Sequence, residues 1–383
     1  MKIALGMIIR SLDSDKELMR FLNNAESYGH KLDCAIAAYT HHLDQRVERS
    51  LSGKLPFHAI DIKDARYCYE QLSRRGITDA ATQTLLKCPV DPKGGLVPYG
   101  YNRTIVVLEA LLRGVDILFF ADSDVYPSAL KITKVGLTAE EVDFFGAHLE
   151  HQYKGSQVTT GEYSGYNILP KASFDGMEDL LAGLDKTEML EYWQSSGTHK
   201  CLTVQPDESS IKASTKILGG NIAIKLSAFS ELPPFFSSHY TIGDELFLSR
   251  GEDTVLGMGI AKNGIACTDV GLYPLHDTYK DYPSEPDLPG DHSVQDRFYY
   301  ACTGWVGRNP FLSYLHGNDL QSTREFQRER LERGLNALAE YTSNPKFLSV
   351  IRNFDASWDS LARYISEYER LLAAWEEVRE KML

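Results

Sequence analysis

The sequence predicts an α/β protein with a mostly parallel mixed sheet, flanking helices and a helical extension at the C-terminus. Strand-like apolar runs alternate with helix-like segments through the first 125 residues. This alternation is typical of a parallel sheet that binds ligands at the carboxyl ends of its strands. Short apolar runs return after residue 217, and the end of the chain shows helical spacing of its apolar residues.

Composition limits the classes of function. The 383 residues include 40 Lys and Arg and 53 Asp and Glu, a net charge of −13, and 43% are hydrophobic. This hydrophobic content excludes a mainly disordered chain. The acidic balance argues against a nucleic-acid polymer as partner, because phosphate contacts need clustered Lys and Arg. The six cysteines are irregularly spaced without a CxxC, so we expect reduced thiols in a cytoplasmic protein.

The N-terminal apolar run could be mistaken for a targeting segment. It stops at Arg10, and Asp13 and Asp15 follow, which makes it short for a signal peptide. We therefore predict a buried first strand over residues 2–9. No window reaches the roughly 18 apolar residues that a membrane-spanning helix needs, so we expect no transmembrane segment.

The remaining elements follow in order from periodicity and turn residues. In the first half we predict strands over 34–39, 58–62 and 116–121, helices over 14–28, 64–75 and 102–113, and a loop over 89–100. In the second half we predict strands over 142–148, 222–224, 265–268 and 270–273, and a helix near 175–195.

These elements predict three regions. Residues 1–125 form the first half of the sheet domain, and residues 126–300 form its second half with a polar insertion over 150–215. Residues 301–383 form a helical region. Apolar residues from Trp358 to Val378 recur at three- and four-residue steps, which predicts an amphipathic helix. We expect its stripe to pack on its own domain, with an oligomer contact as the alternative.

A pair of carboxylates carries the strongest chemical signal. Asp122 and Asp124 follow the apolar run Leu118–Ala121 as a DxD motif. In an extended chain they point to the same side, and they repel each other unless a cation or a donor lies between them. A Mg²⁺ or Mn²⁺ ion carrying a diphosphate would meet this need. A turn or a helix cap is the alternative interpretation.

Three further motifs follow the carboxylate pair. Gly219 and Gly220 precede a strand and allow the backbone to approach a ligand closely, although a plain tight turn is also consistent with them. Glu252 and Asp253 open a helix, where acidic residues usually serve as caps, and where a catalytic carboxylate could be held rigidly. His276 follows a strand and could be a metal ligand, although a lone His is more often structural.

The order of these motifs resembles the glycosyltransferases of the GT-A fold, a Rossmann-like fold, and within it family 2 and its relatives. The stretch from Tyr99 to Asp124 resembles the family's segment up to its DxD motif, and the Gly219–Gly220 turn resembles its donor and acceptor loop. The later acidic pair and His276 are similar to the pattern of mannosylglycerate synthase and the polypeptide N-acetylgalactosaminyltransferases. The second strand departs from the family, because an Asp-rich turn is missing after Tyr39.

The resemblance implies a metal-dependent transfer of a sugar from a UDP- or GDP-type nucleotide-diphosphate sugar to a hydroxyl acceptor. It also implies nucleotide binding for residues 1–125, and acceptor binding and catalysis for residues 126–300. Asp122, Asp124 and His276 would hold the divalent cation, and Asp122 could instead contact the donor sugar. Asp253 or Glu252 would orient the acceptor hydroxyl or take its proton. The donor nucleotide would be contacted by residues at strand ends, on a helix and in the glycine turn: Arg10, Tyr39, Arg103, Asp122, Gly219 and Gly220.

Two other classes remain open. A sugar nucleotidyltransferase also uses metal and carboxylates, but it usually needs a Gly-rich basic loop after the first strand, and residues 9–13 contain no Gly. A nucleotide-sugar-binding protein without catalysis is the third class. Among weaker candidates, His148, Glu150 and His151 lack metalloprotease spacing. Aromatic residues that could stack on an acceptor sugar are Tyr163, Tyr166, Trp193 and Trp305, with core packing preferred for Trp305. Arg297, Tyr300 and Arg308 lie in a predicted helix and loop after the site, and no specific role is assigned to them.

Overall fold

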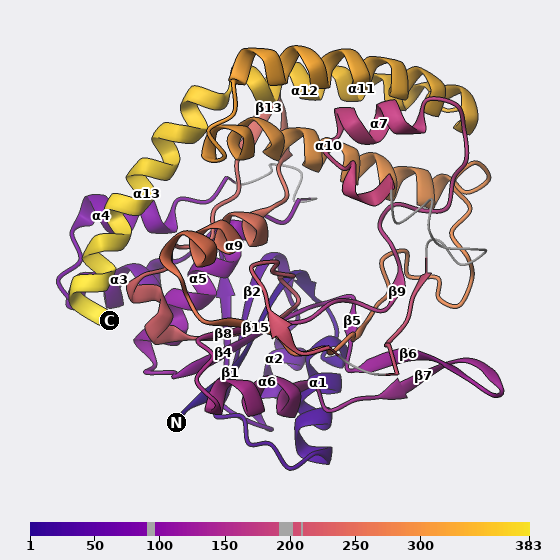
Figure 1. The fold of residues 1–383 in the computed structure, drawn as a ribbon. Coiled ribbons are helices and arrows are strands. Elements are labelled where there is room, and N and C mark those ends of the chain that lie inside the picture. Colours follow the sequence, from indigo (N-terminus) through magenta and orange to yellow (C-terminus); the bar gives the residue numbers. More distant parts are fainter. Residues whose placement is uncertain (90–95, 191–201, 208–209) are drawn as a thin grey trace.

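The computed structural model describes residues 1–89, 96–190, 202–207 and 210–383, and Figure 1 shows the course of the chain. An eight-stranded sheet in the order β11-β15-β8-β12-β4-β1-β2-β3 forms the centre of the fold. Its strands are β1 Ile3–Leu12, β2 Cys34–Leu43, β3 Phe57–Asp61, β4 Ile117–Asp122, β8 Val158–Thr160, β11 Lys212–Ala213, β12 Asn221–Lys225 and β15 Cys267–Asp269.

The sheet is mixed, and its first half is parallel. β1 pairs in parallel with β2 and with β4, and β2 pairs in parallel with β3. β12 pairs antiparallel with β4 and β8, and β15 pairs in parallel with β8. These pairings confirm the predicted α/β class with a mostly parallel mixed sheet. Residues 150–215 are polar and were predicted to form an insertion. The structure shows that β8, which belongs to this segment, is one of the inner strands of the sheet.

The central strands are buried on both faces, and this explains why β1 and β4 read as continuous apolar runs. Phe119 and Phe120 are adjacent in β4 and point to opposite faces. Phe119 packs against Phe144 and Phe145 on one side, whereas Phe120 packs against Phe235 on the other. Two hydrophobic cores therefore form, one on each face of the sheet.

Helices cover both faces. In the first half they are α1 Lys16–Ser27, α2 Gln45–Ser52, α3 Arg66–Arg74, α4 Asp79–Leu86 and α5 Tyr99–Leu112. The predicted helices over 14–28, 64–75 and 102–113 are confirmed within a few residues. Residues 90–95 of the predicted loop lie outside the described residues.

The prediction of a strand over 142–148 is wrong. These residues enter helix α6, Phe144–Tyr153, because the Asp143 side chain caps its first turn by accepting a hydrogen bond from the Gly146 amide. Phe144, Phe145 and Leu149 then face the sheet. The predicted strand over 270–273 is also absent, and pairing begins later, at β16, Leu275–His276.

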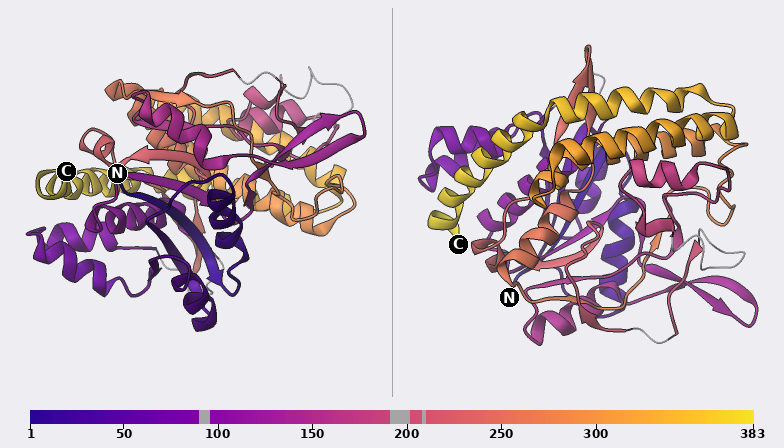
Figure 2. Two further views of the ribbon diagram at one scale, coloured as in Figure 1. Left: turned by 90° about the horizontal axis from the view of Figure 1, so that it is seen from below. Right: turned by 45° about the horizontal axis from the view of Figure 1, so that its top comes forward.

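Several short two-stranded pairs lie outside the central sheet. β5 Val125–Tyr126 pairs with β16, and β6 Ser128–Thr133 forms a hairpin with β7 Gly136–Glu141 that extends from the body in Figures 1 and 2. The other short elements are β9 Gly165–Tyr166, α7 Met177–Gly183, β10 Leu202–Thr203, the 3₁₀ turn Leu226–Ser230, β13 His239–Ile242, β14 Glu245–Leu248 and α9 Glu252–Asn263.

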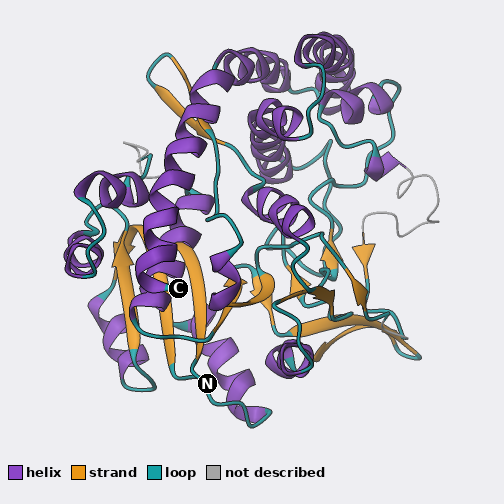
Figure 3. Cartoon of the chain, turned by 60° about the vertical axis from the view of Figure 1, so that its left-hand side comes forward, coloured by secondary structure: helices purple, strands orange, loops and turns teal. Residues whose placement is uncertain are grey.

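Helices dominate the C-terminal region, as predicted, and Figure 3 shows them gathered beside and above the sheet. They are α10 His292–Leu315, α11 Leu320–Thr342, the 3₁₀ turn Pro345–Ser349, α12 Val350–Asp359 and α13 Leu361–Met382. The predicted amphipathic stripe is split, because Trp358 belongs to α12. α13 packs on its own chain: the Trp375 indole N–H donates to the Phe229 carbonyl at 3.3 Å, and Arg379 donates to the Leu232 carbonyl at 2.8 Å.

Two simpler expectations concern helices and thiols. Within the described residues, no helix combines the length and hydropathy that a membrane crossing needs. The five described cysteines are free thiols, and Cys201 lies outside the described residues.

Candidate active site

Asp122 ends β4 at the edge where the parallel strands present their carboxyl ends. In the register of the sheet it pairs with Ile8 of β1, and Ile9 of β1 pairs in turn with Tyr39 of β2. Arg10 and Tyr39 therefore lie at the same edge as the DxD motif, Arg10 exposed and Tyr39 half-buried. This edge is where α/β sheets bind ligands. The role of Arg10 and Tyr39 in binding a nucleotide stays a prediction.

Arg103 is the structural hub of the candidate site. It lies on α5 and is fully buried, with 1% of its surface exposed. Its guanidinium donates to Asp122 at 2.7 Å, to Glu252 at 3.3 Å and to the Gly219 carbonyl at 2.6 Å. Three of the predicted motifs therefore meet at one side chain.

This pairing also decides the charge of the hub. Burial alone would lower the pKa of Arg103, but Asp122 and Glu252 raise it well above its ordinary value. The guanidinium is therefore a permanent cation that fixes one oxygen of Asp122. In this geometry Arg103 holds Oδ1 of Asp122, and the role of Asp122 as a metal ligand stays a prediction.

The two glycines are required by close packing at this hub. A Cβ atom on Gly219 would lie 2.5 Å from Nη2 of Arg103, and one on Gly220 would lie 2.7 Å from the Asp122 carboxylate and from the Tyr163 hydroxyl. The Gly220 amide donates to that hydroxyl at 2.8 Å. The turn before β12 therefore allows the backbone to approach Arg103 and Asp122 directly.

Asp124 and His276 form the second pair of the site. Nε2 of His276 lies 3.3 Å from Oδ2 of Asp124, and Arg297 approaches the same oxygen at 3.8 Å. Burial opposes ionisation of Asp124, but His276 and Arg297 outweigh it and hold the pKa of this carboxyl below its usual range. Asp124 is thus poised as an anion with a nitrogen donor beside it.

Several contacts position His276. The pairing of β16 with β5 places it opposite Val125, and the Asp277 amide donates to the Asp124 carbonyl at 2.9 Å. The Tyr163 ring packs on the imidazole with centroids 4.7 Å apart, and Nδ1 of His276 lies 3.2 Å from the Thr278 hydroxyl. The bond to Thr278 leaves Nε2 facing Asp124.

The arrangement of Asp124 and His276 fits a divalent cation. Adjacent ligands of an octahedral ion bound at about 2.1 Å lie about 3 Å apart, close to the 3.3 Å between Oδ2 and Nε2. Among the described residues, no group of three or more His, Cys, Asp or Glu side chains is arranged around one metal position. Further ligands would therefore come from water or from the donor's phosphates.

Glu252 and Asp253 have different environments at the start of α9. Glu252 is buried, accepts from Arg103, and has its pKa raised to about 7 by burial and by the charge of Asp253. Asp253 is half-buried and accepts hydrogen bonds from the amide and the hydroxyl of Thr254. Asp253 is therefore the carboxylate of the pair that faces outward, whereas Glu252 holds Arg103.

Two positioning residues were not identified by motif reasoning. Arg20 of α1 donates to the Ser123 carbonyl inside the DxD motif, and its guanidinium lies 4.0 Å from the centre of the Tyr126 ring. Tyr163 supports both the glycine turn and His276, whereas the sequence suggested only sugar stacking for it. Nothing in the local spacing of either residue signals these long-range contacts.

The weaker metal candidate is part of the core. His148 lies on α6, is fully buried, and bonds to the Thr159 hydroxyl at 2.9 Å and to the Asn221 side chain at 3.0 Å. Burial lowers its pKa to about 4, so it is a neutral structural link between α6 and two strands. Trp305 is also buried, as expected for core packing. Trp193 lies outside the described residues.

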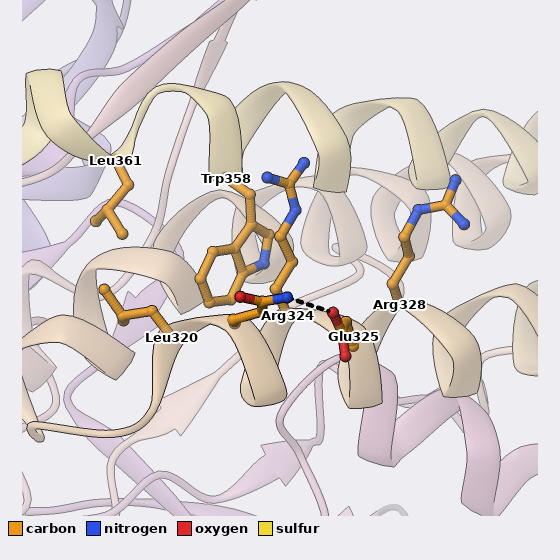
Figure 4. A pocket seen from close by; sticks show the side chains of 7 residues that line it. Leu320, Arg324, Glu325, Arg328, Trp358 and Leu361 are labelled. Atoms are coloured by element: carbon orange, nitrogen blue, oxygen red, sulfur yellow. Dashed lines mark hydrogen bonds between the residues drawn. The ribbon is translucent and has the colours of Figure 1, made fainter.

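A cavity of about 530 Å³ lies among the C-terminal helices (Figure 4). Trp358 and Leu361 contribute apolar surface to it, and Arg324, Glu325 and Arg328 of α11 form its polar wall. None of the predicted site residues lines this cavity, so it is separate from the Asp124 site.

No model of a protein family matches this chain, and no curated protein matches it. Solved structures do: glucosyl-3-phosphoglycerate synthase from Mycobacterium tuberculosis, in a complex with Mn²⁺, UDP-glucose and glycerol 3-phosphate, is 13% identical with a TM-score of 0.37. That match covers 83% of this chain and 80% of the other.

Two further solved structures are similar. A mycobacterial protein is 12% identical with a TM-score of 0.38, covering 80% of this chain and 74% of its own. Residues 1–349 of TarS from S. aureus are 12% identical with a TM-score of 0.35, covering 99% and 92%. Because all of these TM-scores lie below 0.5, the similarities transfer no ligand, activity or residue role to this chain.

Proposed function

We propose that this protein is a metal-dependent glycosyltransferase that moves a sugar from a nucleotide-diphosphate sugar to a hydroxyl acceptor. The observation that carries the proposal is the convergence of the four sequence motifs on one site. Arg103 joins Asp122, Glu252 and the Gly219 carbonyl, and Asp124 faces His276. A fold-stabilising role alone would not require three carboxylates, an imidazole and a close-packed glycine turn at the carboxyl ends of the parallel strands.

Each group has a role that follows from its environment. Asp124 and His276 would hold a Mn²⁺ or Mg²⁺ ion, which when bound neutralises charge on the diphosphate leaving group. Asp122, fixed by Arg103, would accept hydrogen bonds from the donor's sugar or ribose. Asp253 would orient the acceptor hydroxyl, and in an inverting reaction it would take the proton.

The donor half of the site is the part of this proposal that can be tested first. Purified protein is incubated with a panel of UDP- and GDP-sugars, with and without Mn²⁺, and the released phosphates are identified. Release of nucleotide diphosphate supports sugar transfer or donor hydrolysis. Pyrophosphate release would instead indicate a nucleotidyltransferase, and a bound but unchanged donor would indicate a binding protein.

Asp124→Ala tests the metal role directly. We expect it to abolish Mn²⁺-dependent donor cleavage, because it removes the only carboxylate that faces His276 among the described residues. Asp244→Ala is the matched control, since Asp244 is exposed in the turn between β13 and β14. Undiminished turnover in Asp124→Ala would overturn the metal assignment.

A further inference from the structure

One face of α10 runs along the candidate site. Arg297, Tyr300, Gly304 and Arg308 follow one another at steps of three and four residues, so they share one side of the helix. Arg297 at one end approaches Asp124. At the other end, Nη1 of Arg308 donates to the Thr254 hydroxyl at 3.5 Å. The face therefore reaches from the metal side to the acceptor side of the site.

Two arginine side chains at this face, Arg250 and Arg308, pack directly against glycine residues. A Cβ atom on Gly304 would lie 2.8 Å from Cγ of Arg250, whose guanidinium lies 5.6 Å from the centre of the Tyr300 ring. A Cβ atom on Gly251 would lie 2.8 Å from Cδ of Arg308. A larger residue at either glycine would collide with the arginine side chain, so the backbone at these two positions fixes where the aliphatic parts of Arg250 and Arg308 lie.

The guanidinium groups are nevertheless incompletely paired. Nε of Arg250 and Nε of Arg308 are both buried, and neither has a hydrogen-bond partner among the residues that the structure describes. Within the described part of the chain, neither side chain has a carboxylate at the salt-bridge distance of 4.0 Å. Leaving a buried donor unsatisfied is costly, whereas arginine forks match carboxylate and phosphate oxygens. The Nε atoms themselves are closed to solvent, but both residues are only partly buried, so a ligand oxyanion would bind at their outer guanidinium nitrogens.

Neighbouring charges are consistent with an anion site. Burial lowers the pKa of Arg308, the charges of Asp253, Asp185 and Glu188 oppose this shift, and the positive charge of Arg250 adds to it. Lys186 lies close by and its Nζ is bonded to Glu188 at 2.8 Å, so its charge is already balanced. Arg250 and Arg308 are therefore two neighbouring cations beside Asp253, and neither has a carboxylate within salt-bridge distance among the described residues.

We propose that Arg250 and Arg308 bind an oxyanion, a carboxylate or a phosphate, carried by the acceptor, and thereby place its hydroxyl beside Asp253. The inference rests on the proposed sugar transfer and names the chemical class of its acceptor. The donor diphosphate is the other anion of that reaction, but it belongs at Asp124, whereas Arg308 contacts the residue that follows Asp253. The acceptor is therefore an anionic hydroxyl compound.

The first experiment measures anion binding without a donor, so it stays informative even if no sugar is transferred. Inorganic phosphate and acetate are titrated separately into the full-length protein by calorimetry, and the stronger probe identifies the preferred oxyanion. We expect Arg250→Gln and Arg308→Gln each to weaken binding of that probe by about tenfold or more. Arg352→Gln, at an exposed position of α12, is the matched control and should bind as the parent does.

Arg308→Lys separates the effect of the positive charge from the effect of the guanidinium geometry. It keeps the charge without the guanidinium fork, so its phosphate affinity should lie between those of the parent and Arg308→Gln. Phosphate and acetate binding that is absent from the parent, or equal in the parent and both Gln variants, would overturn the proposal.

Saturation with nucleotide diphosphate and Mn²⁺ distinguishes the acceptor from the donor. If the oxyanion belongs to the acceptor, the chosen probe should still bind with the nucleotide present. Loss of probe binding on nucleotide addition would assign Arg250 and Arg308 to the donor diphosphate and overturn the acceptor proposal, while leaving the proposed transferase function intact.

Discussion

At the residue scale, the glycines of the site can be tested against the packing that requires them. Gly219→Ala would place a methyl group 2.5 Å from Nη2 of the buried Arg103, which has no room to retreat. We expect a loss of about 1–3 kcal/mol in the free energy of unfolding, as for other overpacked cores, together with weaker donor binding. Urea denaturation and a donor titration would measure the two effects.

Gly53→Ala is the control for this substitution. Gly53 has an ordinary φ of −74°, and the nearest atoms to its added methyl lie at 3.4 Å. Its stability should stay within about 0.5 kcal/mol of the parent. Equal stability of the two variants would show that the Arg103 hub tolerates displacement.

The raised pKa of Glu252 should make the free energy of unfolding decrease as the pH rises. Burial and Asp253 raise its pKa in the folded state from 4.5 to about 7. Between these values the unfolded chain has lost the proton while the folded protein still holds it. Stability therefore falls as pH rises from about 4.5 to 7, and then levels off. The shift corresponds to a loss on the order of 3 kcal/mol.

Glu252→Gln removes this titration. Relative to the parent, the variant should gain stability between pH 5 and pH 8 in urea denaturation, because only the parent must ionise a buried carboxyl over that range. Glu245→Gln, at an exposed position, should follow the parent. An identical pH dependence in the parent and Glu252→Gln would contradict the raised pKa.

The residues that motif reasoning identified are those whose chemistry shows in local spacing. The DxD pair, the double glycine and the acidic pair are visible as short patterns, and the structure brings them together at Arg103. Arg20 and Arg250 gave no such signal, because their partners lie far away in the chain. Their importance depends on tertiary contacts that a single sequence does not encode locally.

At the element scale, buried strands were easier to predict than the segments around them. β1 and β4 are continuous apolar runs, so only the sheet could hold them. Residues 142–148 have the same apolar character, but they include Asp143, which caps a helix that begins at Phe144. Short apolar runs do not distinguish a strand from a buried helix by periodicity, and the cap decides the outcome here.

Helix α13 provides a test of packing on its own domain against packing on a partner. Trp375 is fully buried, and its ring lies 5.7 Å from that of Phe229. Trp375→Ala should lower the free energy of unfolding by about 3–5 kcal/mol, whereas Tyr153→Ala, at a side chain that is 64% exposed, should change it little. A changed sedimentation coefficient with unchanged stability would instead assign α13 to an oligomer contact.

At the scale of the whole molecule, the site collects residues from both halves of the sheet domain. Arg103 and Asp124 come from the first part of the chain, and Gly219, His276 and Arg297 come from the second. An unfolded chain cannot bring these groups together. Ligands of the site should therefore bind the native state alone and stabilise the entire fold by mass action.

The last prediction follows from this distribution. Mn²⁺ together with the preferred nucleotide diphosphate, each at about one hundred times its dissociation constant, should stabilise the protein by about 2.7 kcal/mol or more. Thermal unfolding would show this as a raised Tm that EDTA reverses. Asp124→Ala should lose the Mn²⁺-dependent part of the shift, because His276 alone is a weak ligand, while Asp244→Ala should keep it. A full shift in Asp124→Ala would place the ion elsewhere, and with it the chemistry proposed for this edge of the sheet.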